Sequence, residues 1–210
     1  MKHEWRKKEK EIYLPPTLPK VLHVPEFKYL TIKGNGNPNS AKFSEYIKAL
    51  YSLAYVIKMS PKKEKAPKGY FDYTVYPLEG VWDISEDAKK RYNGKIEKDK
   101  LVFKLMIRQP AFVEEEFVCK MIEETKNKKP HTLLDEIRFE KISEGKCIQM
   151  MHIGSYETEP VSFKKMEKFA EEQELTRVSK THREIYLNDA RKVAPEKLKT
   201  VLRFQVKDKI

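Results

Sequence analysis

A glutamate and a tyrosine lie two residues apart in the short run 182–187, which reads HREIYL. If this run is a β-strand, Glu184 and Tyr186 share one face, while the isoleucine and the leucine share the other. We expect the apolar face to meet the helices, so that Glu184 and Tyr186 face away from them. A carboxylate among aromatic rings can bind a flat cation, or can take a proton from water once burial raises its pKa. The alternative is that Arg183 or Arg203 neutralises Glu184 at the surface.

Aromatic side chains also gather where two other predicted strands end. Tyr76 is followed by the segment 77–82, PLEGVW, which ends in a tryptophan. The segment 152–157, HIGSYE, has a histidine, a tyrosine and a glutamate at the matching place later in the chain. Such groups can stack on a flat ligand, although a lone tryptophan such as Trp82 is more often a core or lid residue. These two segments are therefore further candidates for a binding site.

Other common catalytic chemistries leave no signature in the sequence. The five histidines lack the close pairing of a zinc site, and there is no Gly-x-Ser-x-Gly nucleophile motif. The run Gly34-Asn35-Gly36 precedes a helix without a phosphate-binding continuation, and we interpret it as a turn. Cys119 and Cys147 form no Cys-x-x-Cys pair, which suits a reducing compartment. We therefore predict a cytoplasmic protein with no metal and no cofactor.

The elements that must position these residues follow from hydrophobic periodicity. Apolar residues recur at intervals of three and four along three segments, which predicts helices over 40–58, 111–126 and 159–172. Aromatic and aliphatic runs predict strands over 27–33, 70–76, 101–107, 184–187 and 198–206. Two more strands, 134–142 and 146–153, flank Glu144-Gly145 and should form a hairpin. The pattern is typical of an α+β protein.

The two halves of the chain share a spacing that indicates a duplication. Phe43 follows Gly34 by nine residues, and Phe163 follows Gly154 by nine residues. Each glycine ends a predicted strand, each phenylalanine lies early in a helix, and two more strands follow each helix. We therefore expect two β-α-β-β modules, packed as a pseudo-twofold pair with a ligand pocket at the seam between them.

Most of the positive charge lies in the first third of the chain. The net charge of the whole chain is +11, and residues 1–69 contribute +9 of it. Lysine and arginine neutralise phosphates, so this distribution is compatible with nucleic acid binding. The prolines at positions 15, 16 and 19, however, make residues 1–20 an irregular arm without room for a helix-turn-helix. We predict a soluble basic surface and no specific nucleic acid partner.

The sequence predicts neither a membrane-spanning segment nor a secretory signal. No segment approaches the roughly 18 to 20 consecutive apolar residues that cross a bilayer, and the first residues lack the apolar core of a secretory signal. We expect no membrane contact. After the arm of residues 1–20, residues 21–210 should form a single domain, with repeats at about 21–130 and 131–210.

Four stretches of the sequence together resemble the GyrI-like small-molecule-binding domain family. They are residues 77–82, 103–110, 149–160 and 184–203. More narrowly, they are similar to the stand-alone members that hydrolyse DNA-alkylating cyclopropanoid antibiotics. The resemblance implies a GyrI-like, SOUL-like fold of duplicated β-α-β-β modules, with a cleft between the halves that binds flat apolar molecules. This agrees with the repeat seen in the spacing.

The resemblance also implies roles for particular residues. The family's signature glutamate falls on Glu184, and Glu157 is a second carboxylate that could act as the base. The residues implied to bind a flat aromatic ligand are Trp82, Tyr76, Tyr156, Tyr186, His152 and Tyr46. Two other readings stay open, a non-catalytic binder of drugs or metabolites and a module that binds another protein such as DNA gyrase. The net charge of +11 disfavours the last, since such a module would mimic the acidic surface of DNA.

Overall fold

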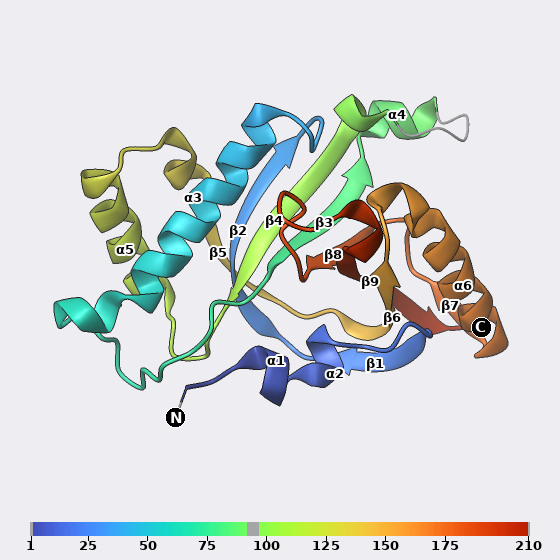
Figure 1. Cartoon of the computed structure of the whole chain (residues 1–210), viewed down its shortest axis with the longest axis horizontal. Helices are drawn as coiled ribbons and strands as arrows, with labels where there is room; N and C mark the ends of the chain where they lie inside the picture. The colour runs from blue at the N-terminus through green and yellow to red at the C-terminus, as the bar shows by residue number, and fades with distance from the viewer. Residues whose placement is uncertain (1, 92–96, 210) are drawn as a thin grey trace. The chain divides into compact units, whose positions relative to one another are not determined.

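The computed structural model of the chain describes residues 2–91 and 97–209 (Figure 1). Its helices are α1 (Trp5–Lys8), α2 (Lys10–Tyr13), α3 (Ala41–Lys58), α4 (Glu86–Lys90), α5 (Glu115–Lys128) and α6 (Glu159–Glu172). Its strands are β1 (Lys20–Val24), β2 (Phe27–Asn35), β3 (Leu78–Ile84), β4 (Leu101–Gln109), β5 (Arg138–Ile142), β6 (Gly145–Ile153), β7 (Leu175–Arg177), β8 (His182–Tyr186) and β9 (Lys199–Asp208). No helix within these ranges is long and apolar enough to cross a membrane.

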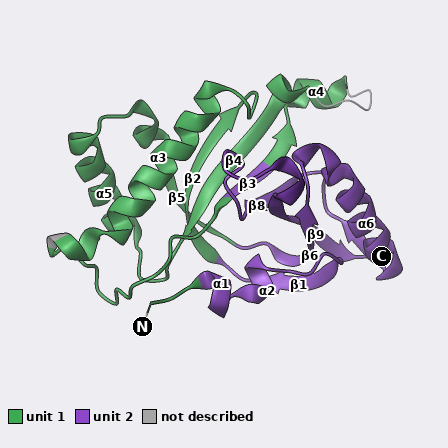
Figure 2. Ribbon diagram, in the orientation of Figure 1, with its two compact units in different colours: residues 1–4, 27–78, 82–142 green, residues 5–26, 79–81, 143–210 purple. Residues whose placement is uncertain are grey.

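The chain divides into two compact units (Figure 2). Unit 1 comprises residues 1–4, 27–78 and 82–142, and unit 2 comprises residues 5–26, 79–81 and 143–210. Strand β3 contributes to both, because its middle residues, 79–81, belong to unit 2. Each unit has its own strands and helices.

Unit 1 is built on an antiparallel sheet with the order β5-β2-β4-β3. Helix α3 contacts β2 and β4, and α5 packs against α3. The Ser40 hydroxyl caps α3 by accepting a hydrogen bond from the Phe43 amide at 3.2 Å. Leu50, Leu53 and Ile57 are fully buried, as the predicted period of three and four requires.

Unit 2 is built on strands in the order β1-β6-β9-β8, with β7 paired to β9. Helix α6 lies over one face, where its Met166 joins a core that includes Met150 of β6 and Leu202 of β9. The register places Glu184 of β8 opposite Leu202, and Leu202 opposite Met150, so Glu184 lies on this helix-covered face.

The predicted duplication and the α+β class are confirmed. The first copy of the module is β2-α3-β3-β4, and the second copy is β6-α6-β8-β9. In both, the first and last strands pair antiparallel, with Tyr29 opposite Arg108 in one and Gln149 opposite Arg203 in the other. The predicted helices over 40–58 and 159–172 match α3 and α6. The pseudo-twofold packing, the cleft between the copies and the domain boundaries stay predictions.

The prediction of a strand over 70–76 is wrong, because the strand is β3, a few residues later. Residue 73 makes only an isolated bridge with residue 3. The side chains of this segment pack instead around Phe112, whose ring lies 5.1 Å from that of Tyr70 and 5.1 Å from that of Phe71. The helix predicted from residue 111 begins only at Glu115, so Phe112 lies in the loop before it.

The predicted hairpin around Glu144-Gly145 is also wrong. Strand β5 pairs with β2, whereas β6 pairs with β1 and β9, so the two strands belong to different units. Residues 1–20 are not wholly irregular, since they contain the short helices α1 and α2. The Met151 amide donates to the Pro16 carbonyl at 2.8 Å, which ties this segment to β6. Strands β1 and β7 are not in the sequence-based prediction.

Candidate functional site

Glu184 of β8 is the centre of a buried hydrogen-bonded group in unit 2. The Tyr186 hydroxyl donates to Glu184 Oε2 at 2.7 Å, which confirms that these two side chains share a face. His182 Nε2 lies 3.1 Å from Glu184 Oε1. Glu184 is only 8% exposed, so these donors replace much of the water that a carboxylate would otherwise bind.

The predicted orientation of this face is wrong. Glu184 and Tyr186 do not face away from the helices, because α6 covers the same side of the sheet. The His182 ring lies 4.7 Å from the ring of Phe163, which is on α6. The apolar Ile185 points to the other face, where strand alternation places it.

A second carboxyl group, Glu159, lies against Glu184 and was missed by sequence reasoning. It is the first residue of α6 and is 6% exposed. Burial and the negative charge of Glu184 raise the pKa of Glu159 far above its ordinary value. The Glu159 carboxyl therefore stays protonated, and its O–H donates a hydrogen bond to Glu184. The other oxygen, Glu159 Oε1, has no hydrogen-bond partner among the described residues. A glutamate in the first turn of a helix is usually a solvated partner of the helix dipole, so the sequence carried no signal for this role.

Tyr156 lies at the exposed edge of this group and is 41% exposed. Its ring meets that of Tyr186 edge-on, with the centroids 6.0 Å apart. Desolvation and the negative charge of Glu184 raise the pKa of Tyr156 to about 12. Its hydroxyl therefore stays protonated at neutral pH and can donate a hydrogen bond. Glu157, the next residue, is exposed, and its catalytic role stays a prediction.

The two arginines that the alternative prediction paired with Glu184 have other partners in unit 2. Arg183 Nη1 donates to Glu79 Oε2 at 2.6 Å, and Arg203 Nη1 donates to Glu144 Oε2 at 2.8 Å. Arg203 also donates to the side chain of Gln149 and to the Ile12 carbonyl. Full burial raises the pKa of Glu79, and the nearby guanidinium groups oppose that rise. The alternative reading of Glu184 as a surface ion pair with arginine is therefore wrong.

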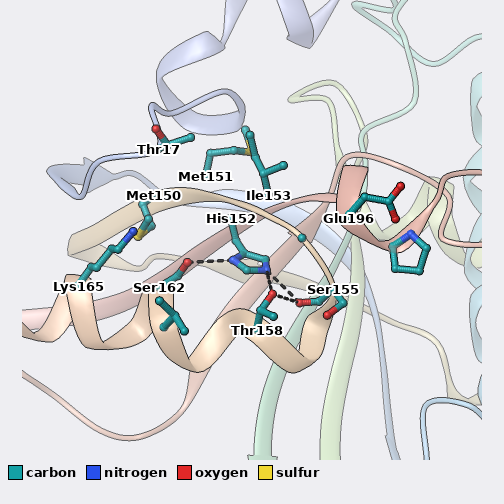
Figure 3. Close-up of a pocket in the computed structure, with 13 residues that line it drawn as sticks. Thr17, Met150, Met151, His152, Ile153, Ser155, Thr158, Ser162, Lys165 and Glu196 are labelled. Atoms are coloured by element: carbon teal, nitrogen blue, oxygen red, sulfur yellow. Dashed lines mark hydrogen bonds between the residues drawn. The ribbon is translucent and has the colours of Figure 1, made fainter.

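A cavity of about 610 Å³ also lies beside α6 in unit 2 (Figure 3). Its lining comes from β6, α6 and three connecting segments and consists of Thr17, Met150, Met151, His152, Ile153, Gly154, Ser155, Thr158, Val161, Ser162, Lys165, Pro195 and Glu196. His152, which we predict to bind substrate, has both ring nitrogens engaged here. Nδ1 lies 2.9 Å from Ser162 Oγ, and Nε2 lies 3.0 Å from the Ser155 carbonyl oxygen.

The other predicted binding residues lie in unit 1. The Trp82 ring packs 5.3 Å from that of Phe103, and the Tyr46 ring lies 5.4 Å from the same phenylalanine. Gly34 makes room for this packing, since a Cβ there would come within 2.5 Å of Phe103. Tyr76 lies apart from this group, with the Arg108 guanidinium 4.6 Å from its ring centroid. All three are buried, and their part in binding stays a prediction.

Within residues 2–91 and 97–209, no group of three or more histidine, cysteine, aspartate or glutamate side chains is arranged to ligate a metal ion.

The family model for the GyrI-like small molecule binding domain matches residues 18–207. The chain belongs to the GyrI-like family. This GyrI-like protein is therefore a small-molecule-binding protein, and the match spans both copies of the module. A search of curated proteins gives no match.

Solved structures give the same fold. One crystal structure of a hydrolase from Listeria innocua superposes with a TM-score of 0.90 at 35% identity, covering 99% of this chain and 100% of that chain. Another, also of a hydrolase from Listeria innocua, has a TM-score of 0.88 at 34% identity and covers 98% and 100% of the two chains. The C-terminal domain of EcmrR shares the fold at 13% identity, with a TM-score of 0.53 over 94% of this chain and 99% of that one.

Proposed function

We propose that this GyrI-like protein is a hydrolase that opens the cyclopropane ring of DNA-alkylating cyclopropanoid antibiotics by adding water. The observation that carries the proposal is the buried carboxylate of Glu184, held by Tyr186, His182 and Glu159 beside a tyrosine ring. The likeness to two hydrolases from Listeria innocua supports a hydrolytic activity. Reaction with water would inactivate the alkylating agent before it could modify the cell's DNA.

Glu184 is the residue that we assign as general base. Its hydrogen bonds fix the direction of its oxygens, so a bound water can be held in one orientation toward an electrophilic carbon. Glu157 is the alternative base. Its side chain is exposed, whereas that of Glu184 is buried and held in place by hydrogen bonds.

Tyr156 is the residue that we assign as hydrogen-bond donor. Its raised pKa of about 12 keeps the proton on its hydroxyl. The aromatic rings of Tyr156 and Tyr186 offer surfaces on which a flat alkylating unit can stack. Trp82, Tyr76 and Tyr46 are the further aromatic residues proposed to contact the ligand.

The reaction balances with water as the only co-reactant. The water oxygen forms a bond to the unsubstituted cyclopropane carbon, and the carbon–carbon bond to the flat ring system breaks. The electron pair of that bond moves through the ring to the carbonyl oxygen, which becomes a phenol oxygen. Glu184 takes one proton from the water, and the phenol oxygen receives one, helped by the Tyr156 hydroxyl.

The test is incubation with a cyclopropanoid antibiotic of the yatakemycin or duocarmycin type, followed by mass spectrometry for the ring-opened product with one added water. We expect turnover by the wild type and a loss of roughly 100-fold or more in Glu184→Gln, the range for a general base. Glu157→Gln is the matched control and should keep most activity. No turnover by the wild type, or equal turnover by both variants and the wild type, contradicts the proposal.

A second candidate is a non-catalytic protein that binds flat cations. Three groups, Tyr186, His182 and Glu159, surround the buried carboxylate of Glu184, which can serve as the counter-charge to a bound cation. Binding of a flat cationic dye, measured by calorimetry, would distinguish the two. This reading expects tight dye binding that Glu184→Gln abolishes, with no product formed from the antibiotic.

A further inference from the structure

A serine and a histidine of the second copy meet at the cavity of unit 2. Ser162 lies on α6 and His152 on β6, and His152 Nδ1 is 2.9 Å from Ser162 Oγ (Figure 3). Both residues are nearly buried, at 6% and 4% exposure, and both line the cavity. A serine in this position relative to an imidazole is a candidate nucleophile.

The surrounding hydrogen bonds fix which nitrogen carries the proton. The Ser155 carbonyl oxygen can only accept, so at 3.0 Å it takes a hydrogen bond from His152 Nε2–H. The Thr158 hydroxyl donates to the same carbonyl at 2.7 Å, which leaves its oxygen to face Nε2–H at 3.2 Å. The lone pair of Nδ1 therefore points at Ser162, whose hydroxyl donates to it. A histidine held in this tautomer is arranged to take the proton of a serine.

The fold itself does not require this pair. At the equivalent positions of the first copy, counted from the matching glycine, stand Ile32 and Lys42. In the second copy the backbone is shaped around the histidine. A Cβ on Gly154 would lie 3.3 Å from His152 Nε2 and 2.9 Å from Thr158 Oγ1, at a φ of +142° that other residues rarely adopt.

The cavity beside the pair favours an apolar substrate with a polar centre. Met150 and Met151 supply apolar lining, and Ile153 and Val161 remain 50% and 59% exposed at the same cavity. Lys165 lies one helical turn after the serine, on the same side of α6, and brings a positive charge to the cavity. A cation there can stabilise the negative charge that develops on an attacked carbonyl oxygen.

We propose that Ser162 and His152, one helical turn along α6 from Glu159, form a second catalytic pair that hydrolyses carboxylic esters with a small apolar acyl chain. Ser162 Oγ bonds to the ester carbonyl carbon while its proton moves to His152 Nδ1. The bond from the carbonyl carbon to the alcohol oxygen then breaks, and the alcohol leaves with that proton. Water attacks the acyl-serine next, giving one proton to Nδ1, and the carboxylic acid leaves as Ser162 recovers its proton.

The first measurement is covalent labelling with a fluorophosphonate probe, followed by tandem mass spectrometry of the α6 peptide. The second is hydrolysis of p-nitrophenyl butyrate by the full chain. We expect an adduct on Ser162 in the wild type and a loss of hydrolysis of roughly 100-fold or more in Ser162→Ala. Ser44→Ala is the matched control, because Ser44 is an exposed serine early in α3 of the first copy, and it should label and react like the wild type.

The adduct keeps the proposal testable even if Ser162→Ala folds poorly. A hydrogen bond that merely joins α6 to β6 would not make the serine react with the probe. An adduct on Ser162 together with the loss in Ser162→Ala supports the proposal. Absence of that adduct in the wild type, or hydrolysis by folded Ser162→Ala at the wild-type rate, overturns it. Neither result depends on whether Glu184 opens cyclopropane rings.

Discussion

The two copies of the module use the same framework for different chemistry. Equivalent positions on the paired strands carry Arg108 in the first copy and Arg203 in the second. The Arg108 guanidinium lies 3.4 Å from the ring centroid of Phe27, whereas Arg203 is bound to Glu144 and Gln149. Aromatic rings predominate near the strand ends of the first copy. The second copy instead contains buried carboxyl, hydroxyl and imidazole groups.

This difference teaches how a duplicated fold can acquire a site without losing its core. The strand pairing and the helix contact depend on backbone hydrogen bonds and on apolar residues that both copies retain. Positions that do not serve this purpose are free to differ. In the second copy they carry Ser162 and His152, and at the equivalent positions the first copy carries Lys42 and Ile32.

The largest effect that we expect comes from breaking the buried ion pairs of the second copy. Arg203→Met should lower the free energy of unfolding by about 3–5 kcal/mol, because it leaves Glu144 with fewer partners in a buried place. The control in the first copy is Lys104→Met. Its pair with Glu140 is about 30% exposed and should be worth about 1 kcal/mol or less. Chemical denaturation measures both, and equal losses would remove the contrast between the copies.

A smaller effect should come from filling the space that the first copy keeps for its aromatic rings. Gly34→Ala places a methyl group within 2.5 Å of Phe103 and should cost about 1–3 kcal/mol. Phe103→Leu in the same chain should recover part of this loss, so that the double variant costs less than the sum of the two single ones. Strict additivity in thermal or chemical unfolding would mean that the two residues do not press on each other.

The last expected effect concerns the dependence of stability on pH. Since the pKa of Glu159 is raised in the folded state, that state holds a proton which the unfolded chain has lost above the ordinary value of 4.5. The stability linked to this group is complete below that value and falls as the pH rises toward the raised pKa. The slope is at most about 1.4 kcal/mol per pH unit.

Glu159→Gln should flatten this slope, because an amide can still donate to Glu184 and does not titrate. Glu157→Gln, which changes an exposed neighbour, should leave the slope as it is. Denaturation at about pH 6 and about pH 8 compares the three proteins. An unchanged slope in Glu159→Gln would show that Glu159 is ionised in the folded state.

Much of the fold could be predicted because its signals are local. The periods of α3 and α6, and the apolar runs of β4, β8 and β9, are each carried by a single stretch of chain. The glycine-to-phenylalanine spacing likewise exposed the duplication. The errors fall where a distant partner decides the outcome. Residues 70–76 have strand composition, yet their rings pack around Phe112, and β5 pairs with β2 instead of with its neighbour in sequence.

The candidate site likewise combines features that follow from local sequence with features that depend on distant packing. Strand alternation by itself determined that Glu184 and Tyr186 share a face, since that depends only on backbone geometry between residues two apart. Only the tertiary structure decided which face α6 covers, and so brought Glu159 against Glu184 and Ser162 against His152. Each of these pairs joins α6 to a strand, and the position of α6 depends on its packing against the whole sheet. Their chemistry arises from burial and mutual charge, and no short stretch of sequence contains either.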